Sequence, residues 1–124
     1  MRRAIDAFNR RDLDRVMRDT DPEVEVDWSR SRGVEAGIYR GRGAARGFWK
    51  TWFQMFDRVT VVPEEFIECG EHVVVPNQAC FWGRDGIKVE ARGVFVNTVR
   101  NGRIVELRLY RDRAEALKAV GLEE

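Results

Sequence analysis

The chain has 124 residues, of which 44% are hydrophobic and 35% charged, and its formal net charge is only +1. This length predicts one domain over residues 1–124. The near balance of charge argues against nucleic acid or an anionic membrane as the main partner, because both attract a basic surplus. No apolar run is long enough to span a membrane and no signal-peptide pattern is present, so we expect a cytoplasmic protein.

The cysteines and the single histidine predict neither a disulfide nor a metal site. A turn near residues 70–71 would place Cys69 opposite Val74, far from Cys80, whereas a disulfide needs two Cα atoms within roughly 7 Å. His72 lies in a predicted turn and makes no ligand spacing with the two cysteines. We therefore expect two free thiols, no metal and no cofactor.

The start of the chain predicts two short helices and a strand. Apolar residues at helical spacing indicate a helix over residues 2–9, and Asp12 can cap a second helix that ends before Pro22. Residues 23–28 then alternate as a strand whose apolar face carries Val24, Val26 and Trp28.

A loop and the longest helix follow. Residues 29–43 are rich in Gly, Arg and Ser and predict a loop that contains Tyr39. Residues 44–56 predict the main helix. Its wide apolar stripe must pack against a sheet, and it consists of Ala45, Phe48, Trp49, Trp52, Phe53 and Phe56.

The second half predicts an antiparallel meander. Strands are expected over residues 59–68 and 73–82, and a hairpin over residues 87–111 turns at Asn101-Gly102, a dipeptide that tolerates the positive φ angles of a two-residue turn. A last helix begins after Asp112 and stops at Gly121. The order of elements predicts an α+β fold with helices on the concave face of a curved sheet.

Four stretches of the chain also follow the order seen in a known family: AFNRRDLD at residues 7–14, GIYRGR at 37–42, NGRIV at 101–105 and YRDRAEAL at 110–117. They resemble the SnoaL-like branch of the nuclear transport factor 2-like superfamily. The resemblance implies a conical, cystatin-like α+β barrel that is usually a dimer through its convex sheet face. Because polyketide cyclases, ketosteroid isomerases, limonene epoxide hydrolases, scytalone dehydratases and non-catalytic binding proteins share this fold, it implies a pocket without fixing its use.

None of these mechanisms transfers intact to the chain. The isomerases' general base falls on Trp28, or on Asp27 after a one-residue gap, and strand alternation favours Trp28 facing inward. Their oxyanion-binding tyrosine falls on Ala4 and their oxyanion-binding aspartate on Val94. The functional positions of the epoxide hydrolases fall on Gln78, Cys80 and Leu109. Aliphatic side chains at such positions cannot transfer a proton.

Counting cross-strand partners outward from the hairpin turns predicts one cluster of polar side chains. The turn at Asn101-Gly102 places Val94 opposite Leu109, and a three-residue turn at 84–86 places Cys80 opposite Glu90 and Gln78 opposite Arg92. We interpret Glu90 as a candidate base, with Arg92 and Gln78 holding an oxyanion or carbonyl. The alternative interpretation is a solvent-exposed Glu–Arg pair without chemistry.

Other candidates carry similar alternatives. Asp27 is a second candidate base or a strand-end acid beside arginines. Trp28, Tyr39 and Trp82 are candidates for stacking on a ring-shaped ligand, or they fill the core. The candidate ligand-binding set is Trp28, Tyr39, Gln78, Cys80, Trp82, Val94 and Leu109. A convex dimer surface is expected from the mixture of aromatic, Arg and polar residues Glu106, Arg108, Tyr110, Phe81, Phe95 and Asn97.

Three classes of function fit the sequence. The first is a cofactor-free lyase, isomerase or cyclase for a small hydrophobic carbonyl compound, which predicts a cavity with a desolvated acid. The second is a protein that binds such a molecule without turnover, which predicts an apolar cavity with satisfied polar groups. The third is an interaction module whose vestigial pocket is filled by side chains.

Overall fold

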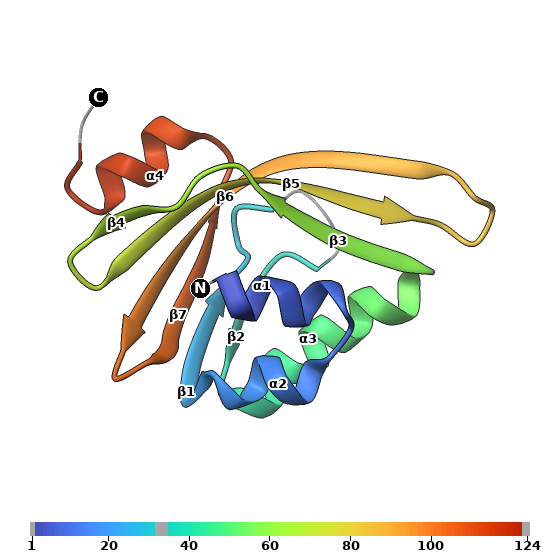
Figure 1. Cartoon of the computed structure of the whole chain (residues 1–124), viewed down its shortest axis with the longest axis horizontal. Coiled ribbons are helices and arrows are strands. Elements are labelled where there is room, and N and C mark those ends of the chain that lie inside the picture. The colour runs from blue at the N-terminus through green and yellow to red at the C-terminus, as the bar shows by residue number, and fades with distance from the viewer. Residues whose placement is uncertain (1, 32–34, 123–124) are drawn as a thin grey trace.

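The computed structural model describes residues 2–31 and 35–122, and these form a seven-stranded mixed sheet and four helices (Figure 1). The predicted α+β class is confirmed. Along the chain the elements are α1 (Arg2–Asn9), α2 (Leu13–Arg18), β1 (Thr20–Asp27), β2 (Ile38–Arg40), α3 (Arg42–Met55), β3 (Arg58–Pro63), β4 (Ile67–Cys69), β5 (His72–Trp82), β6 (Lys88–Arg100), β7 (Arg103–Tyr110) and α4 (Arg113–Ala119).

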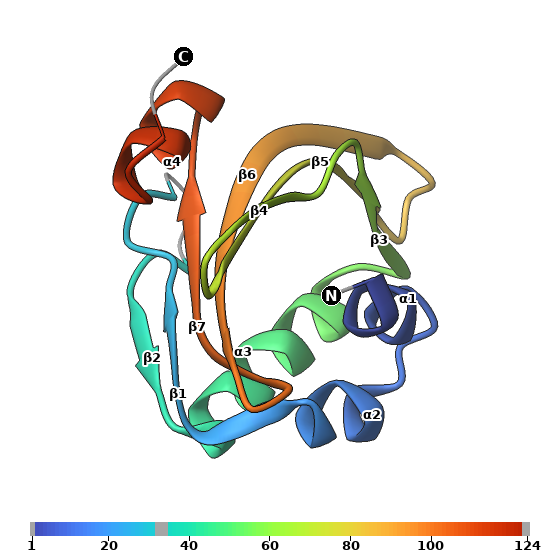
Figure 2. The same cartoon turned by 60° about the vertical axis from the view of Figure 1, so that its left-hand side comes forward.

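The sheet is strongly curved, and it wraps around three of the helices (Figure 2). Its strand order is β2-β1-β7-β6-β5-β3, with β4 paired to β5 off this path. Neighbouring strands are antiparallel except β1 and β7, which are parallel. Helices α1, α2 and α3 lie on the concave side, whereas α4 lies on the convex side (Figure 2).

Local sequence signals set most of the element ends. The side chain of Asp12 accepts a hydrogen bond from Arg15 N and caps α2, and Asp112 caps α4 through Glu115 N. Asn101 and Gly102 have φ angles of 52° and 75°, as the predicted two-residue hairpin turn requires.

Three element predictions need correction. The predicted loop contains β2, which pairs with β1, while residues 32–34 of that loop lie outside the described residues. Strand β1 starts at Thr20 and includes Pro22, which is tolerated because β1–β7 pairing is irregular between Thr20 and Glu25. The strand predicted over residues 59–68 is interrupted and forms β3 and β4.

A one-residue β-bulge in β7 overturns the predicted pairing of the last hairpin. Val99 pairs with Ile104, but Thr98 pairs with Glu106, so Val105 has no partner on β6. Beyond the bulge every pair is shifted by one residue, and Val94 lies opposite Tyr110 rather than Leu109. Because side chains alternate along a strand, a shift of one residue exchanges the two faces.

The bulge therefore changes which residues of β6 face the helices. Phe95 and Asn97, predicted on the convex surface, line the concave side instead. Phe81 also faces the helices, since its ring packs against Trp52 and Phe56 at centroid distances of 5.4 and 5.1 Å. The predicted convex surface keeps only Glu106, Arg108 and Tyr110.

Two apolar clusters stabilise opposite sides of the sheet. On the concave side, strands β1 and β7 pack against α3 through buried residues that include Val24, Val26, Phe48 and Leu107. On the convex side, α4 covers a cluster that contains Val74, Val94, Val96, Tyr110 and Leu117. The sheet is thus buried on both faces where β6 crosses it, which explains the continuous apolar run of that strand.

The cysteine predictions have a mixed outcome. Cys69 and Cys80 are free thiols, as expected. Their environment differs from the prediction, because Cys69 lies opposite His72 rather than Val74. The Cys69 thiol donates a hydrogen bond to Val120 O at 3.4 Å, which fastens β4 to the end of α4.

Candidate ligand-binding site

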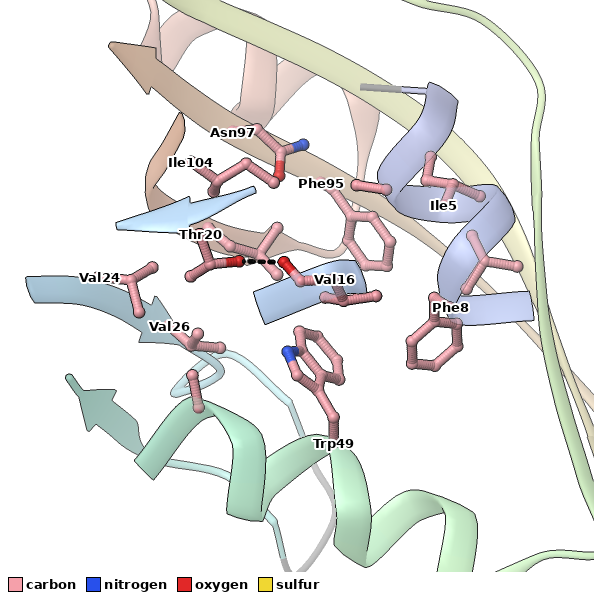
Figure 3. Close-up of a pocket in the computed structure, with 14 residues that line it drawn as sticks. Ile5, Phe8, Val16, Thr20, Val24, Val26, Trp49, Phe95, Asn97 and Ile104 are labelled. Carbon is pink, nitrogen blue, oxygen red and sulfur yellow. Dashed lines mark hydrogen bonds between the residues drawn. The ribbon is translucent and has the colours of Figure 1, made fainter. Parts of the chain in front are cut away.

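A cavity of about 80 Å³ lies between the concave face of the sheet and helices α1, α2 and α3 (Figure 3). Ile5 and Phe8 of α1 and Val16 of α2 form one wall, and Trp49 of α3 forms another. Strands β1, β3, β6 and β7 supply the remaining lining. This volume is several times the roughly 10–15 Å³ that one water molecule requires.

Two polar side chains line this apolar cavity, and they differ in how they are bonded. The Thr20 hydroxyl donates a hydrogen bond to Val16 O at 2.8 Å, so its hydrogen is already used. Asn97 is only 1% exposed, and its Nδ2 atom has no hydrogen-bond partner within the described part of the chain. A buried amide without a partner is uncommon in folded proteins because it loses its hydration without compensation.

No titratable side chain occurs among the described residues that line the cavity. The lining consists of aliphatic and aromatic residues with one threonine and one asparagine. General acid–base catalysis needs a group that exchanges a proton within hydrogen-bond reach of the substrate. The arrangement can therefore bind and orient a molecule, but the described lining residues offer no proton-transfer group.

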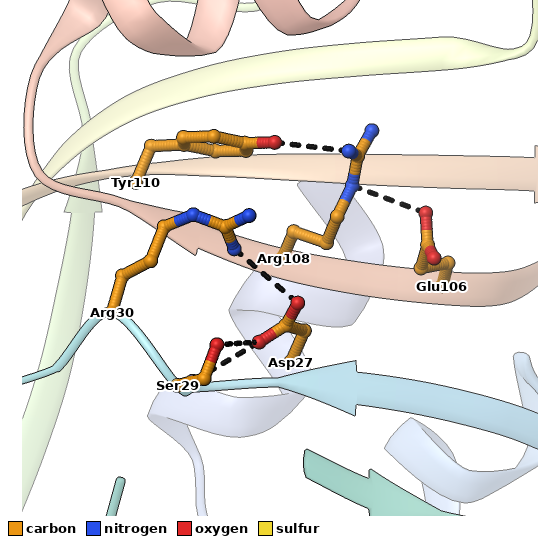
Figure 4. Close-up of polar contacts among 6 residues, drawn as sticks. All are labelled: Asp27, Ser29, Arg30, Glu106, Arg108 and Tyr110. Atoms are coloured by element: carbon orange, nitrogen blue, oxygen red, sulfur yellow. Dashed lines mark hydrogen bonds and ion pairs between the residues drawn. The ribbon is translucent and has the colours of Figure 1, made fainter. Parts of the chain in front are cut away.

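Asp27, the second candidate base, lies at the end of β1, where it contacts Ser29 and Arg30 (Figure 4). It is not among the described residues that line the cavity. Burial raises the pKa of its carboxyl group. Hydrogen bonds from the Ser29 hydroxyl and amide, together with the positive charge of Arg30, outweigh burial and lower the pKa below its usual value. The neighbouring Trp28 faces the helices, where its ring packs 5.2 Å from that of Phe48.

The constellation around Glu90 is paired as predicted, with Cys80 opposite Glu90 and Gln78 opposite Arg92. Glu90 is exposed, near the end of the β5–β6 hairpin that projects beyond the helices (Figure 1). A hydrogen bond and the charge of Lys88 lower the Glu90 pKa, and Gln78 Nε2 donates a second hydrogen bond at 2.6 Å. These residues lie on the convex side and outside the cavity lining, and their catalytic role stays a prediction.

The remaining candidates are divided between the two faces. Tyr39 of β2 packs 4.6 Å from Phe48, and its hydroxyl donates to Glu35 O at 2.8 Å. Burial and the nearby Glu35 raise the Tyr39 pKa. Leu109 packs in the concave core, whereas Val94 is covered by α4.

Trp82 lies at the end of β5, between two cations. The Arg58 guanidinium carbon is 4.8 Å from the centroid of its ring, and Lys88 Nζ is 5.2 Å away. Trp28, Tyr39 and Leu109 therefore belong to the concave core, while Gln78, Cys80, Trp82 and Val94 belong to the convex side. None of the seven predicted ligand-binding residues is among the residues that line the cavity.

Sequence reasoning placed Asn97 on the convex surface and assigned Trp49 mostly to core packing, so both were missed as cavity residues. The signal for Asn97 was its position two residues after Phe95 on a strand that is apolar on both faces. Alternation alone could not select the inward face there, because Val94 and Val96 are as apolar as Phe95. The bulge at Val105 decides the face, and a tight hairpin turn predicts uninterrupted pairing.

No protein among curated sequences matches the chain. Solved structures, in contrast, share its architecture. An NTF2-like protein of unknown function from Burkholderia pseudomallei is 27% identical, with a TM-score of 0.78 over 97% of this chain and 93% of its own. A Mycobacterium tuberculosis protein in complex with estradiol-17β-hemisuccinate is 20% identical, with a TM-score of 0.78 over 88% of each chain.

A third solved structure, TerC co-crystallised with polyporic acid, is 21% identical, with a TM-score of 0.76 over 94% of this chain and 91% of its own. At these low identities the last two likenesses show the fold alone. The family model for the SnoaL-like domain matches residues 1–107, which is most of the chain. The chain belongs to the SnoaL-like domain family, within the NTF2-like fold.

Proposed function

We propose that the chain binds a small apolar molecule in the cavity between the concave sheet face and helices α1–α3. The observation that carries this proposal is a space of about 80 Å³ whose lining is almost entirely apolar. The walls of such a space lose the dispersion contacts that a filled core would have. A ligand of matching shape supplies these contacts.

Structural relatives support the same use of the fold. The Mycobacterium tuberculosis protein holds estradiol-17β-hemisuccinate, and TerC was co-crystallised with polyporic acid. Both are organic molecules with rings. We infer a ring-containing molecule as the ligand class of this chain as well, because the cavity walls include the rings of Phe8, Trp49 and Phe95.

Binding without turnover fits the cavity better than the predicted lyase, isomerase or cyclase activity. Such an activity needs an acid or base near the substrate, and the described lining contains neither. The third predicted class, a vestigial pocket filled by side chains, fits less well because open space remains beside Trp49 and Asn97 (Figure 3).

Cavity filling at Ala45 tests the proposal. Ala45 lines the cavity on α3 with no exposed surface, whereas its neighbour Ala44 is exposed. Isothermal titration with benzene, ethylbenzene and acetophenone should show one saturable site in the wild type. Ala45→Leu should weaken binding at least about tenfold because the added side chain occupies the cavity, and the matched control Ala44→Leu should not. Failure of all three probes to bind, or equal binding by both variants, would contradict the proposal.

We also propose that two copies associate through the convex face of β7. There Arg108 pairs with Glu106 at 3.1 Å, and both side chains stay partly exposed, whereas the neighbouring Tyr110 is buried. Arginine side chains are enriched at interfaces. Sedimentation should show a dimer that Arg108→Glu weakens and the exposed control Arg103→Glu does not, and a wild-type monomer at micromolar concentration would contradict this interface.

A further inference from the structure

We propose that Asn97 selects ligands that carry an uncharged oxygen acceptor, such as a ketone carbonyl, by donating a hydrogen bond from Nδ2. This inference rests on the proposed function of the cavity and adds a chemical requirement to it. Apolar shape alone would accept hydrocarbons and ketones alike. A directed donor would separate them, because a ligand without an acceptor leaves the amide unpaired.

The Asn97 amide is placed to meet a molecule in the cavity. Its side chain projects from β6 into the space beside Phe95 and Ile104, with the amide nitrogen toward the side where α1 lies (Figure 3). Only 1% of the residue is exposed, and Nδ2 lacks a partner among the described residues. Solvent outside the protein therefore does not replace the missing hydrogen bond.

A second buried asparagine shows that an unpaired amide is not a general feature of this sheet. Asn77 of β5 is also 1% exposed. Its Nδ2 atom donates a hydrogen bond to Val75 O at 3.0 Å, and it does not line the cavity. The same residue type is thus satisfied away from the cavity and unsatisfied within it. The Trp52 ring nitrogen is also buried without a partner among the described residues, but Trp52 does not line the cavity, so Asn97 is the unpaired donor that a ligand in the cavity can meet.

The surroundings of Asn97 restrict the ligand to a neutral molecule. No charged side chain is among the described lining residues, so an ionised carboxylate would be buried without a counter-charge. The Thr20 hydrogen is already donated to Val16 O. Across the cavity lies the ring of Trp49, which offers an aromatic surface to the apolar body of the ligand (Figure 3).

Ethylbenzene and acetophenone make a matched pair of probes, because they differ only by a methylene in place of a carbonyl. Isothermal titration should compare the wild type with Asn97→Leu, which replaces the amide by an apolar group of similar size. The affinity ratio of acetophenone to ethylbenzene should fall about fivefold or more in the variant, since the lost hydrogen bond affects only the ketone. The control Asn77→Leu should leave the ratio unchanged.

Thermal unfolding without ligand gives an independent readout. Asn97→Leu should raise the Tm because it removes an unpaired buried amide, whereas Asn77→Leu should lower it because it removes a satisfied one. A lower Tm for Asn97→Leu would count against the inference. If that variant fails to fold, Asn97→Ala takes its place in the titrations, with the same expected fall in the ratio.

The outcomes separate the two proposals. If both probes bind the wild type and the ratio is the same in the Asn97 variant, the acceptor requirement is wrong and the binding proposal stands. If neither probe binds the wild type, the binding proposal is wrong and the requirement falls with it. A ratio that falls equally in Asn97→Leu and Asn77→Leu would also overturn the inference, because it would indicate a general effect on the sheet.

Discussion

The two faces of strands β1, β6 and β7 differ in how completely their polar side chains are paired. On the convex face, Asp27 accepts hydrogen bonds from Ser29 and pairs with Arg30 at 3.3 Å, and Arg108 donates to the Tyr110 hydroxyl at 2.9 Å (Figure 4). On the concave face, the Asn97 amide nitrogen has no partner among the residues described.

This contrast separates structural polarity from functional polarity. The charged side chains on the convex face form ion pairs with one another, and this pairing offsets their partial loss of hydration. The Asn97 amide on the concave face lowers the free energy of unfolding as long as it has no hydrogen-bond partner. Folded proteins keep such a local conflict mainly where a binding partner resolves it, so the concave face is where a ligand is expected.

A charge on the concave face of β7 should have the largest effect. Leu107 lies beyond the bulge, pairs with Asn97 and is only 8% exposed on the side that faces the helices. Leu107→Asp replaces a buried apolar side chain by an unpaired charge, so it should lower the free energy of unfolding by about 4 kcal/mol or more. Urea denaturation measures this loss.

The matched control changes Val105, the unpaired residue of the bulge. Val105→Ala should cost only about 1 kcal/mol, because Val105 is half-buried and the register is preserved. A Leu107→Asp variant within about 1 kcal/mol of the wild type would show that Leu107 does not face the helices.

The same bulge marks the limit of what could be predicted from the sequence. The helices, the hairpin turn and the α+β order follow from local spacing, caps and the Asn101-Gly102 signal, and the structure contains them. The β5–β6 register was also predictable, because a short turn fixes it. The face of Asn97 was not, since β6 is apolar on both sides and the unpaired Val105 has no local signature.

Truncating the aromatic centre of α3 should have the next largest effect and should damage the concave face selectively. Phe48 is 2% exposed and packs against the rings of Trp28, Tyr39 and Trp49. Phe48→Ala should lower the free energy of unfolding by about 3–5 kcal/mol through the cavity it leaves. On the same helix, Met55 is 42% exposed, and Met55→Ala should change it by less than about 0.5 kcal/mol. Equal losses in urea denaturation would contradict the packing of α3 on the sheet.

A smaller, pH-dependent effect is expected on the convex face. The Asp27 pKa is lowered in the folded chain, so its charged form stabilises the fold above its usual pKa of about 3.9, and that stabilisation is lost as the pH falls through the lower folded value. Asp27→Asn should cost about 1 kcal/mol at pH 7. The difference from the wild type should shrink progressively below about pH 4. A difference that stays constant from pH 7 to about pH 2 would show that the charge of Asp27 is not responsible.

The smallest effect on ligand affinity is expected at Glu90. A binding site on the concave face predicts that Glu90 is not needed for binding, whereas a site on the convex face predicts that it is. Glu90 is exposed on the convex side, and its partners Lys88 and Gln78 are outside the cavity lining. Glu90→Gln should therefore leave the affinity for acetophenone within about twofold of the wild type, because an exposed ion pair is screened by water. Isothermal titration of acetophenone into Glu90→Gln and Asn97→Leu compares the two sites directly. If Glu90→Gln loses affinity and Asn97→Leu does not, the ligand binds at the convex β5–β6 hairpin instead. Glu90 and Arg92 would then be the residues to test for turnover.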